Sequence, residues 1–231
     1  MQAEQARRIE RSWAELAGVP RLLPRQIIVR PRSMLGREGW VAVLFIGGNL
    51  AVAVPEDALV QRVGDALSEV PLPGINAEAV LSALTSVEVV GPASLFYPPG
   101  SSPFEREPDV FRAAPAELDE FRRTLSEIDL VESGLRDVGS DVFALRGDAS
   151  ALVAVCGYRR WPAHIANLFV ATAPHHRRLG AGRRVAREAI ADAISNGLLP
   201  QWRARPEASK ALARSLGLEE WGFQMSLRLD E

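Results

Sequence analysis

The sequence predicts an α/β (α+β) fold in which helices flank a mixed β-sheet, with an extra N-terminal α+β region. Two observations predict it. Short apolar, β-branched runs alternate with segments whose apolar residues recur every three or four positions, which is typical of strands alternating with helices. A proline- and serine-rich stretch at 97–108 interrupts this alternation. We therefore expect an N-terminal region at 1–97, a linker or loop at 98–109 and a second domain at 110–231, although the stretch equally fits a long surface loop inside one domain.

The first half begins with an amphipathic helix, because Ile9, Trp13 and Leu16 fall on one face and Pro20 follows them. Two glycines at 47–48 separate two β-branched runs and predict a hairpin. The elements expected in this half after the first helix are a strand at 26–30, hairpin strands at 40–46 and 50–54, helices at 59–70 and 76–84, and a strand at 87–90.

The second half alternates more regularly between the two-residue period of strands and the roughly 3.6-residue period of helices. Its longest helical pattern ends at Asn196 and Gly197, where a left-handed residue is expected. The elements expected here are helices at 115–125 and 129–135, a strand pair at 141–145 and 151–158, a strand at 165–172, a helix at 182–196, a strand at 199–204, a helix at 206–216 and a strand at 223–229.

The composition excludes several functional classes. The formal net charge of −2 gives no general attraction to nucleic acid or to an acidic membrane. The N-terminal residues lack the apolar core of a signal peptide, and no apolar run approaches the length of a membrane span, so we expect a cytoplasmic protein. Cys156, the only cysteine, lies in an apolar run and is expected to be a buried, inert thiol. The sequence has no cluster of His, Cys and carboxylates of the kind that holds a metal, so we expect no metal site.

The segment with the clearest chemistry is NLFVATAPHHRRLGAGRRV, at 167–185. A strand runs through a proline into the turn Arg177–Gly182 and then into a long helix. The first amides of a helix lack internal partners and lie at its positive end, so this turn is a candidate anion site. Gly180 and Gly182 would let a ligand approach the backbone. The arginines that could pair with phosphate there are Arg177, Arg178, Arg183 and Arg184.

Two other phosphate motifs do not fit this turn. A P-loop requires Lys followed by Ser or Thr after its last glycine, and Gly182 is followed by arginine. A dinucleotide fingerprint requires a third glycine where Val185 stands. A nucleotide-phosphate enzyme is therefore disfavoured.

The pattern of strand, proline, Arg-x-x-Gly-x-Gly and helix resembles the acetyl-coenzyme-A motif of the GNAT superfamily of acetyltransferases. The strand at 201–204 and the following helix, with its small residues and Leu-Gly-Leu ending at 216–218, are also similar to that family. The resemblance covers about 110–231 and leaves the first half unexplained. It implies a GNAT-like sheet that binds acetyl-coenzyme A and transfers the acetyl group to a small-molecule or peptide amine, by direct attack in a ternary complex.

The resemblance also implies which residues hold the cofactor. The backbone of Val170, Ala171 and Thr172 would bind pantetheine at a strand edge opened by splaying, and the amide of Val170 would stabilise the oxyanion. The amides from Arg178 to Arg183, which include those of Leu179, Gly180, Ala181 and Gly182, would hold the pyrophosphate beside Arg177.

The sequence departs from the family at the catalytic acid. Pro206 stands where many members have Asn, and Ala213 where many have a Tyr that protonates the leaving thiolate. Ser209, one turn earlier, could contact the cofactor, although helix packing explains it as well.

The general base is open. The candidates are His164 at the start of the core strand and Glu132 on the helix that overhangs the acceptor site, with Glu127 beside it; a surface position explains each as well. His175 and His176 suit cofactor contact better. The missing Tyr leaves a second function open, a non-catalytic acyl-coenzyme A sensor or interaction module. We expect no nucleic acid or membrane partner and allow a homodimer.

Overall fold

The computed structural model describes residues 2–30, 34–100, 104–135, 141–147 and 150–230, and it divides into two compact units. The first unit comprises Met1–Phe96, Ala204–Glu207 and Glu220–Glu231, and the second comprises Tyr97–Arg203 and Ala208–Glu219. A mixed sheet flanked by helices confirms the predicted fold class. The predicted boundaries at 97 and 110 stay a prediction.

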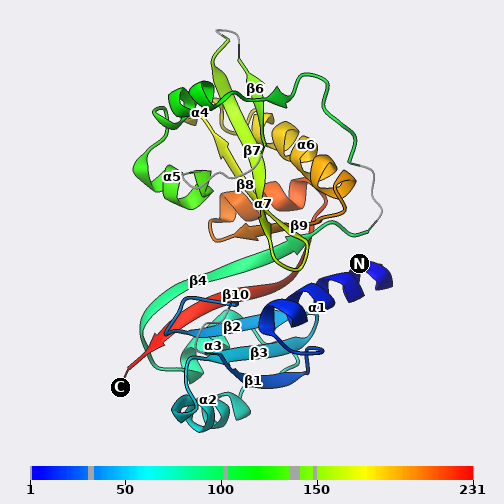
Figure 1. Cartoon of the computed structure of the whole chain (residues 1–231). Helices are drawn as coiled ribbons and strands as arrows, with labels where there is room; N and C mark the ends of the chain where they lie inside the picture. Colours follow the sequence, from blue (N-terminus) through cyan, green and yellow to red (C-terminus); the bar gives the residue numbers. More distant parts are fainter. Residues whose placement is uncertain (1, 31–33, 101–103, 136–140, 148–149, 231) are drawn as a thin grey trace. The chain divides into compact units, whose positions relative to one another are not determined.

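The first unit opens with α1 (Ala3–Ala17), which ends where Gly18 takes a left-handed conformation with φ of 68°. Ile9, Trp13 and Leu16 are buried, as their spacing predicts. The strands of this unit are β1 (Arg25–Val29), β2 (Val41–Ile46), β3 (Asn49–Val54), β4 (Ser86–Tyr97) and β10 (Glu219–Leu229), which lie in the order β1-β3-β2-β10-β4 (Figure 1).

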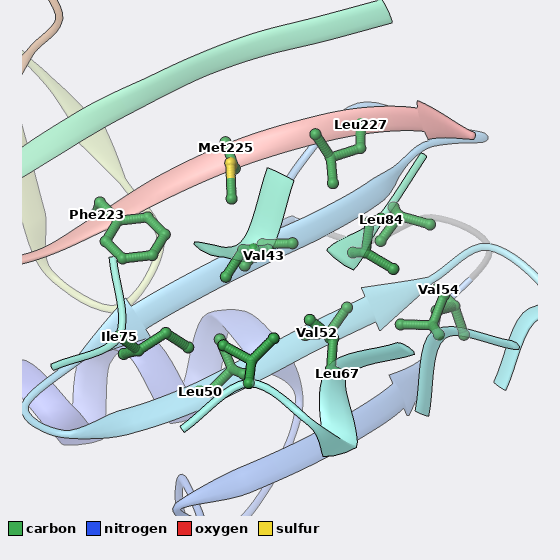
Figure 2. Close-up of a cluster of buried hydrophobic side chains, with 14 residues drawn as sticks. Val43, Leu50, Val52, Val54, Leu67, Ile75, Leu84, Phe223, Met225 and Leu227 are labelled. Carbon is green, nitrogen blue, oxygen red and sulfur yellow. The ribbon is translucent and has the colours of Figure 1, made fainter. Parts of the chain in front are cut away.

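Strand pairing in the first unit is mixed. The hairpin β2–β3 is antiparallel, β1 runs parallel to β3, and β10 runs antiparallel to β2. The helices α2 (Ala58–Ser68) and α3 (Ala77–Ala83) supply Leu67 and Val80 to the core, and the Asn76 side chain caps α3 by accepting from the amide of Ala79 at 2.9 Å. Figure 2 shows Leu50 and Val52 of β3 facing the same cluster as Met225 and Leu227 of β10.

The second unit carries the strands β5 (Phe111–Arg112), β6 (Val142–Arg146), β7 (Leu152–Trp161), β8 (Ile165–Thr172) and β9 (Leu199–Ala204), in the order β9-β8-β7-β6-β5. Neighbouring pairs from β5 to β8 are antiparallel, and β8 and β9 are parallel. Its helices are α4 (Pro115–Arg122), α5 (Glu127–Ser133), α6 (Ala181–Ser195) and α7 (Glu207–Ser215), with a short 3-10 turn, η2, at Pro174–His176.

Helices cover the two faces of this second sheet. Leu118 and Phe121 of α4 and Leu130 of α5 pack on the face that carries Phe169 and Ala171. The start of α6 lies on the other face, because a Cβ atom at Gly182 would meet the side chains of Thr172 and Val170. Figure 1 shows α4 and α5 on one side of these strands and α6 on the other.

Every helix and strand expected from the sequence has a counterpart, and the differences are local. β5 and η2 were not expected, β4 extends well beyond the expected strand at 87–90, and α5 begins at Glu127 because the side chain of Ser126 caps it. The strand expected at 223–229 forms as β10, but it completes the sheet of the first unit. No helix in the described part of the chain combines the length and apolar character that crossing a bilayer requires.

Candidate functional site

The ladder between β8 and β9 is short. It has three rungs, Ile165–Leu199, Ala166–Pro200 and Asn167–Gln201, although both strands continue beyond the last rung. On its other edge β8 stays paired with β7 as far as Thr172. The strands β8 and β9 therefore separate after Asn167, which is the splay that the family resemblance implies.

The direction of the backbone groups along β8 follows from one hydrogen bond. The amide of Ala173 donates to the carbonyl of Val153 at 2.9 Å, and alternate residues of an antiparallel strand bond to the same neighbour. Ala171 therefore directs its amide and carbonyl at β7. Val170 and Thr172 direct theirs at the open edge, as expected for groups that could bind an extended ligand.

The turn after β8 combines two left-handed residues with a helix start. Arg178 has φ of 64° and Gly180, the N-cap of α6, has φ of 85°. The first amides that bond within the helix are those of Arg183 and Arg184, both to the carbonyl of Gly180 at 3.1 and 3.2 Å. Among the described residues, the amides of Ala181 and Leu179 make no such bond, so they remain available at the positive end of α6.

The two glycines of this turn have different roles. A Cβ atom at Gly180 would meet nothing within 4 Å, so the space beside it is open and its left-handed backbone is what requires glycine. A Cβ atom at Gly182 would lie 2.8 Å from the Thr172 hydroxyl, so this glycine lets α6 approach β8 closely. The open space at Gly180 is the side on which a phosphate could approach.

The arginines around the turn divide into two groups. Arg184 is paired with carboxylates away from the turn. It contacts Asp109 at 2.8 Å and Glu107 at 3.4 Å, and these carboxylates raise its pKa. Arg177 contacts Asp129 of α5 at 2.8 Å and donates to the carbonyl of Thr172 at 3.2 Å. The exposed Arg178 and Arg183 make no ion pair with the residues that the structure describes.

The ion pair between Arg177 and Asp129 joins α5 to the turn. A hydrogen bond from Ser126 and the charge of Arg177 together lower the pKa of the Asp129 carboxyl, so it is ionised at neutral pH. The carboxylate takes the guanidinium that an incoming phosphate would also attract.

The residues expected on α7 do not supply an acid. The indole of Trp202 donates to the Ser209 hydroxyl at 3.0 Å, which gives Ser209 a packing role. Ala213 is fully buried. The two tyrosines of the chain are buried as well: Tyr97 donates to Gln201, and Tyr158 donates to Asp192, with burial the main cause that raises its pKa to about 12. The site therefore offers no tyrosine in place of the missing one.

His164 does not begin the core strand. It lies in the turn between β7 and β8, where both Ala163 and His164 are left-handed with φ of 60° and 58°, and its side chain is exposed. Val170 lies six residues further along, about 20 Å at the usual rise of a strand. The structure therefore does not bring His164 together with the open edge.

The other expected catalytic and cofactor residues have mixed placements. Glu132 and Glu127 are exposed on α5, which packs on β8. His175 is exposed in η2, while His176 turns toward Gly147 in the β6–β7 connection and its Nδ1 is buried without a hydrogen bond to the described residues. Burial raises the pKa of the Cys156 thiol, which removes it as a nucleophile at neutral pH.

One set of charged residues was not expected. Two acids on α6, Glu188 and Asp192, are 5% and 3% exposed. Glu188 accepts from Arg106 at 2.8 Å and from the amide of Glu107 at 2.9 Å, and Asp192 accepts from Tyr158 at 2.7 Å. The segment 104–112, which overlaps the predicted linker, is thereby tied to α6. Their four-residue spacing within an apolar helix face was a signal present in the sequence.

Comparisons with known proteins agree with this geometry. The family model described as GNAT acetyltransferase matches residues 141–222. The match falls in the C-terminal half of the chain, where the sequence resemblance places it. A GNAT-family protein from Novosphingobium aromaticivorans has a similar fold, with a TM-score of 0.50 and 22% identity over 63% of this chain and 67% of its own. An acetyltransferase of the GNAT family from Colwellia psychrerythraea gives a TM-score of 0.50 and 13% identity over 77% and 75%.

Comparison with curated protein sequences finds no match. The two similar structures support the fold, and the splayed strands and the glycine turn lie within residues 141–222, which the family model matches. In the described part of the chain, no group of three or more His, Cys, Asp or Glu side chains is placed to hold a metal ion. The expectation of a metal-free site stays a prediction.

Proposed function

We propose that this protein transfers an acetyl group from acetyl-coenzyme A to an amine by direct attack in a ternary complex. The observation that carries the proposal is the separation of β8 from β9 beside the start of α6. Exposed amides along a strand edge suit the amides of pantetheine, and the start of α6 suits the pyrophosphate. The family supplies the general activity and leaves the acceptor open.

The cofactor contacts proposed for this chain follow the geometry. The backbone groups of Val170 and the amide of Thr172 face the open edge, so they would bind pantetheine and the thioester oxygen. The carbonyl of Thr172 accepts from Arg177, and the backbone groups of Ala171 face β7. The amides from Leu179 to Gly182 would hold the pyrophosphate, assisted by the side chains of Arg178 and Arg183. Ser209 would affect the cofactor only indirectly, because its hydroxyl accepts from the Trp202 indole and helps to pack α7.

The reaction forms one bond and breaks one. The amine nitrogen attacks the thioester carbon, the C–S bond breaks, one proton leaves the nitrogen and one is taken up by the coenzyme A sulfur. A preorganised amide at Val170 would stabilise the oxyanion between these events. A covalent route through Cys156 is disfavoured because its thiol is buried and its pKa is raised. Water would carry the proton to the sulfur, since neither tyrosine is placed as an acid, and Glu132 on α5 stays the candidate base.

The alternative is a non-catalytic acyl-coenzyme A sensor. It is favoured by one observation, the full burial of Ala213 where many relatives carry the acid. A cytoplasmic location, a homodimer and the absence of nucleic acid or membrane partners stay predictions.

Two measurements test these functions. A thermal-shift panel of acetyl-coenzyme A, coenzyme A, ATP and NAD should show stabilisation by the first two only, because specific binding stabilises the folded state. Equal stabilisation by ATP would exclude the assignment. Release of free thiol that depends on added amine then separates the enzyme from the sensor.

A further inference from the structure

The two faces of the second sheet differ beside the open edge of β8. The start of α6 covers the face to which Val170 and Thr172 point, and Leu212 of α7 lies on the same side near Gly182. A thioester held along the open edge is therefore screened by helices on that side. The opposite face carries the odd-numbered residues of β8. There α4 and α5 pack on Phe169 and Ala171, so an amine would approach the open edge beside these helices, over the side chains nearer the last rung.

The strand residues that border the splay on this opposite face share a chemical character. Besides apolar side chains such as those of Ile165 and Leu199, the register of β7, β8 and β9 places there two guanidinium groups, two amides and two aromatic rings, and none of these strand residues is a carboxylate. These groups belong to Arg159, Trp161, Asn167, Phe169, Gln201 and Arg203. We call this set the acceptor face.

The two arginines of the acceptor face are held in place. The guanidinium carbon of Arg203 lies 5.2 Å from the centroid of the Trp161 ring, an arrangement in which a flat cation stacks on an aromatic ring. Arg159 donates to the carbonyl of Gly134 at 2.7 Å, where α5 ends. Arg203 and Trp161 are both half-buried, so a ligand can reach them.

The two amides of the acceptor face form the last rung before the strands separate. Gln201 is fully buried, and its side-chain oxygen accepts from the Tyr97 hydroxyl at 3.0 Å, which fixes the direction of its NH₂ group. That NH₂ group and the side-chain oxygen of Asn167 are buried and make no hydrogen bond with the described residues. Buried polar atoms are nearly always paired, so a donor and an acceptor that remain unpaired indicate a polar group still to be bound.

We propose that the acceptor face binds an amine that also carries a carboxylate, the chemistry of an amino acid. This inference rests on the proposed acetyl transfer and names the class of its acceptor. Arg203 would pair with the carboxylate, since a guanidinium binds it through two parallel hydrogen bonds. The oxygen of Asn167 would accept from the amine at the last rung, three residues before Val170. A polyamine would instead require carboxylates, and on this face they lie on α5 and not among these strand residues.

The experiment compares matched acceptors. Purified protein and acetyl-coenzyme A are incubated with alanine or ethylamine, with phenylalanine or phenethylamine, with glutamate, and with spermidine, and kcat/KM is measured from thiol release. We expect the carboxylate member of a pair to have at least a tenfold higher kcat/KM. Arg203→Met should remove this preference by raising KM for the amino acid, and Arg203→Lys should restore part of it.

The control is Arg123→Met, which removes an exposed arginine at the end of α4 and should keep the preference. Stabilisation by acetyl-coenzyme A shows that each variant is folded. Lack of binding of acetyl-coenzyme A, or binding without any transfer, would overturn the proposed function and this inference with it. Transfer that favours ethylamine, phenethylamine or spermidine, or a preference that survives Arg203→Met, would overturn this inference alone.

Discussion

The start and the middle of α6 use charge in opposite ways. The start presents unpaired amides, with exposed Arg178 and Arg183 beside them, and a Cβ atom at Gly180 would meet nothing within 4 Å. The middle buries Glu188 and Asp192 and pairs both of them. The difference teaches that a charge near a helix marks a ligand site only when the protein has left it unpaired. Arg184 shows the same rule, because it lies near the turn and yet is paired with segment 104–112.

The largest effect is expected at the start of α6. Gly180→Glu should weaken acetyl-coenzyme A binding at least 100-fold, because it places a negative charge where the pyrophosphate would lie. The left-handed backbone would cost about 1–2 kcal/mol of stability and leave the chain folded. Isothermal titration calorimetry measures the affinity.

Its matched control lies at the other end of the same helix. Gly197 is also left-handed, with φ of 71°, and a Cβ atom there would also meet nothing within 4 Å. Gly197→Glu should therefore cost a similar amount of stability and leave the affinity unchanged. Equal affinities for the two variants would place the cofactor elsewhere.

The middle of α6 should respond in stability. Asp192→Ala would leave the buried hydroxyl of Tyr158 without its acceptor and remove the contact to Arg112, and we expect a loss of about 2–3 kcal/mol in the free energy of unfolding. Affinity for acetyl-coenzyme A should stay within twofold. Urea denaturation checks the first expectation, with Asp119→Ala, an exposed partner of Arg122, as a nearly silent control. A fall in affinity for acetyl-coenzyme A without a fall in stability would contradict the distinction between the start and the middle of α6.

A smaller effect is expected where α5 meets the turn. Asp129→Asn should free Arg177 for phosphate and strengthen acetyl-coenzyme A binding about two- to fivefold, the range of an exposed ion pair. The pKa of Asp129 is lowered, so its contact with Arg177 is present above the ordinary carboxyl pKa and is lost as pH falls through the lowered value. Affinities of the variant and the parent should therefore converge in acid. Weaker binding by Asp129→Asn at neutral pH would show that the carboxylate assists the cofactor.

The smallest effect is expected at His164, which lies in the turn between β7 and β8 and belongs to neither part of α6. His164→Ala should change kcat/KM by less than twofold and leave the pH–rate profile intact, since its exposed side chain lies about 20 Å from Val170 by the rise of the strand. Loss of a limb near the histidine pKa would restore it as the base.

The sequence predicts best what depends on neighbouring residues. Strand periodicity ends at Thr172 and helical periodicity begins after the two glycines of the turn. These local signals place β8, the turn and α6 correctly, because periodicity and the backbone freedom of glycine depend only on nearby residues. The prediction that His164 begins the core strand was wrong. Ala163 and His164 both adopt a left-handed conformation, so β8 begins one residue later, at Ile165. Neither residue is a glycine, the residue type that usually signals this conformation.

Contacts between distant segments could not be predicted. The contact of Arg184 with Asp109, the bond from Trp202 to Ser209 and the last rung at Gln201 depend on how elements pack and on register. These decide which residues are free to act. The turn at 177–182 was therefore accessible from sequence as a candidate cofactor site, whereas the proposed acceptor face required the strand pairing.

The pairing of β10 with β2 has a consequence for how the chain is made. Met225 lies opposite Val43, so the sheet of the first unit lacks a central strand until the ribosome has passed Glu219, where β10 begins. Synthesis proceeds at about 5–20 residues per second, so one edge of β2 stays unpaired for about 10–40 s after β2 is made. Such an edge can pair with other nascent chains. A nonsense mutation before Glu219 would remove the strand altogether, and we expect the shortened product to be a substrate for chaperones and proteases.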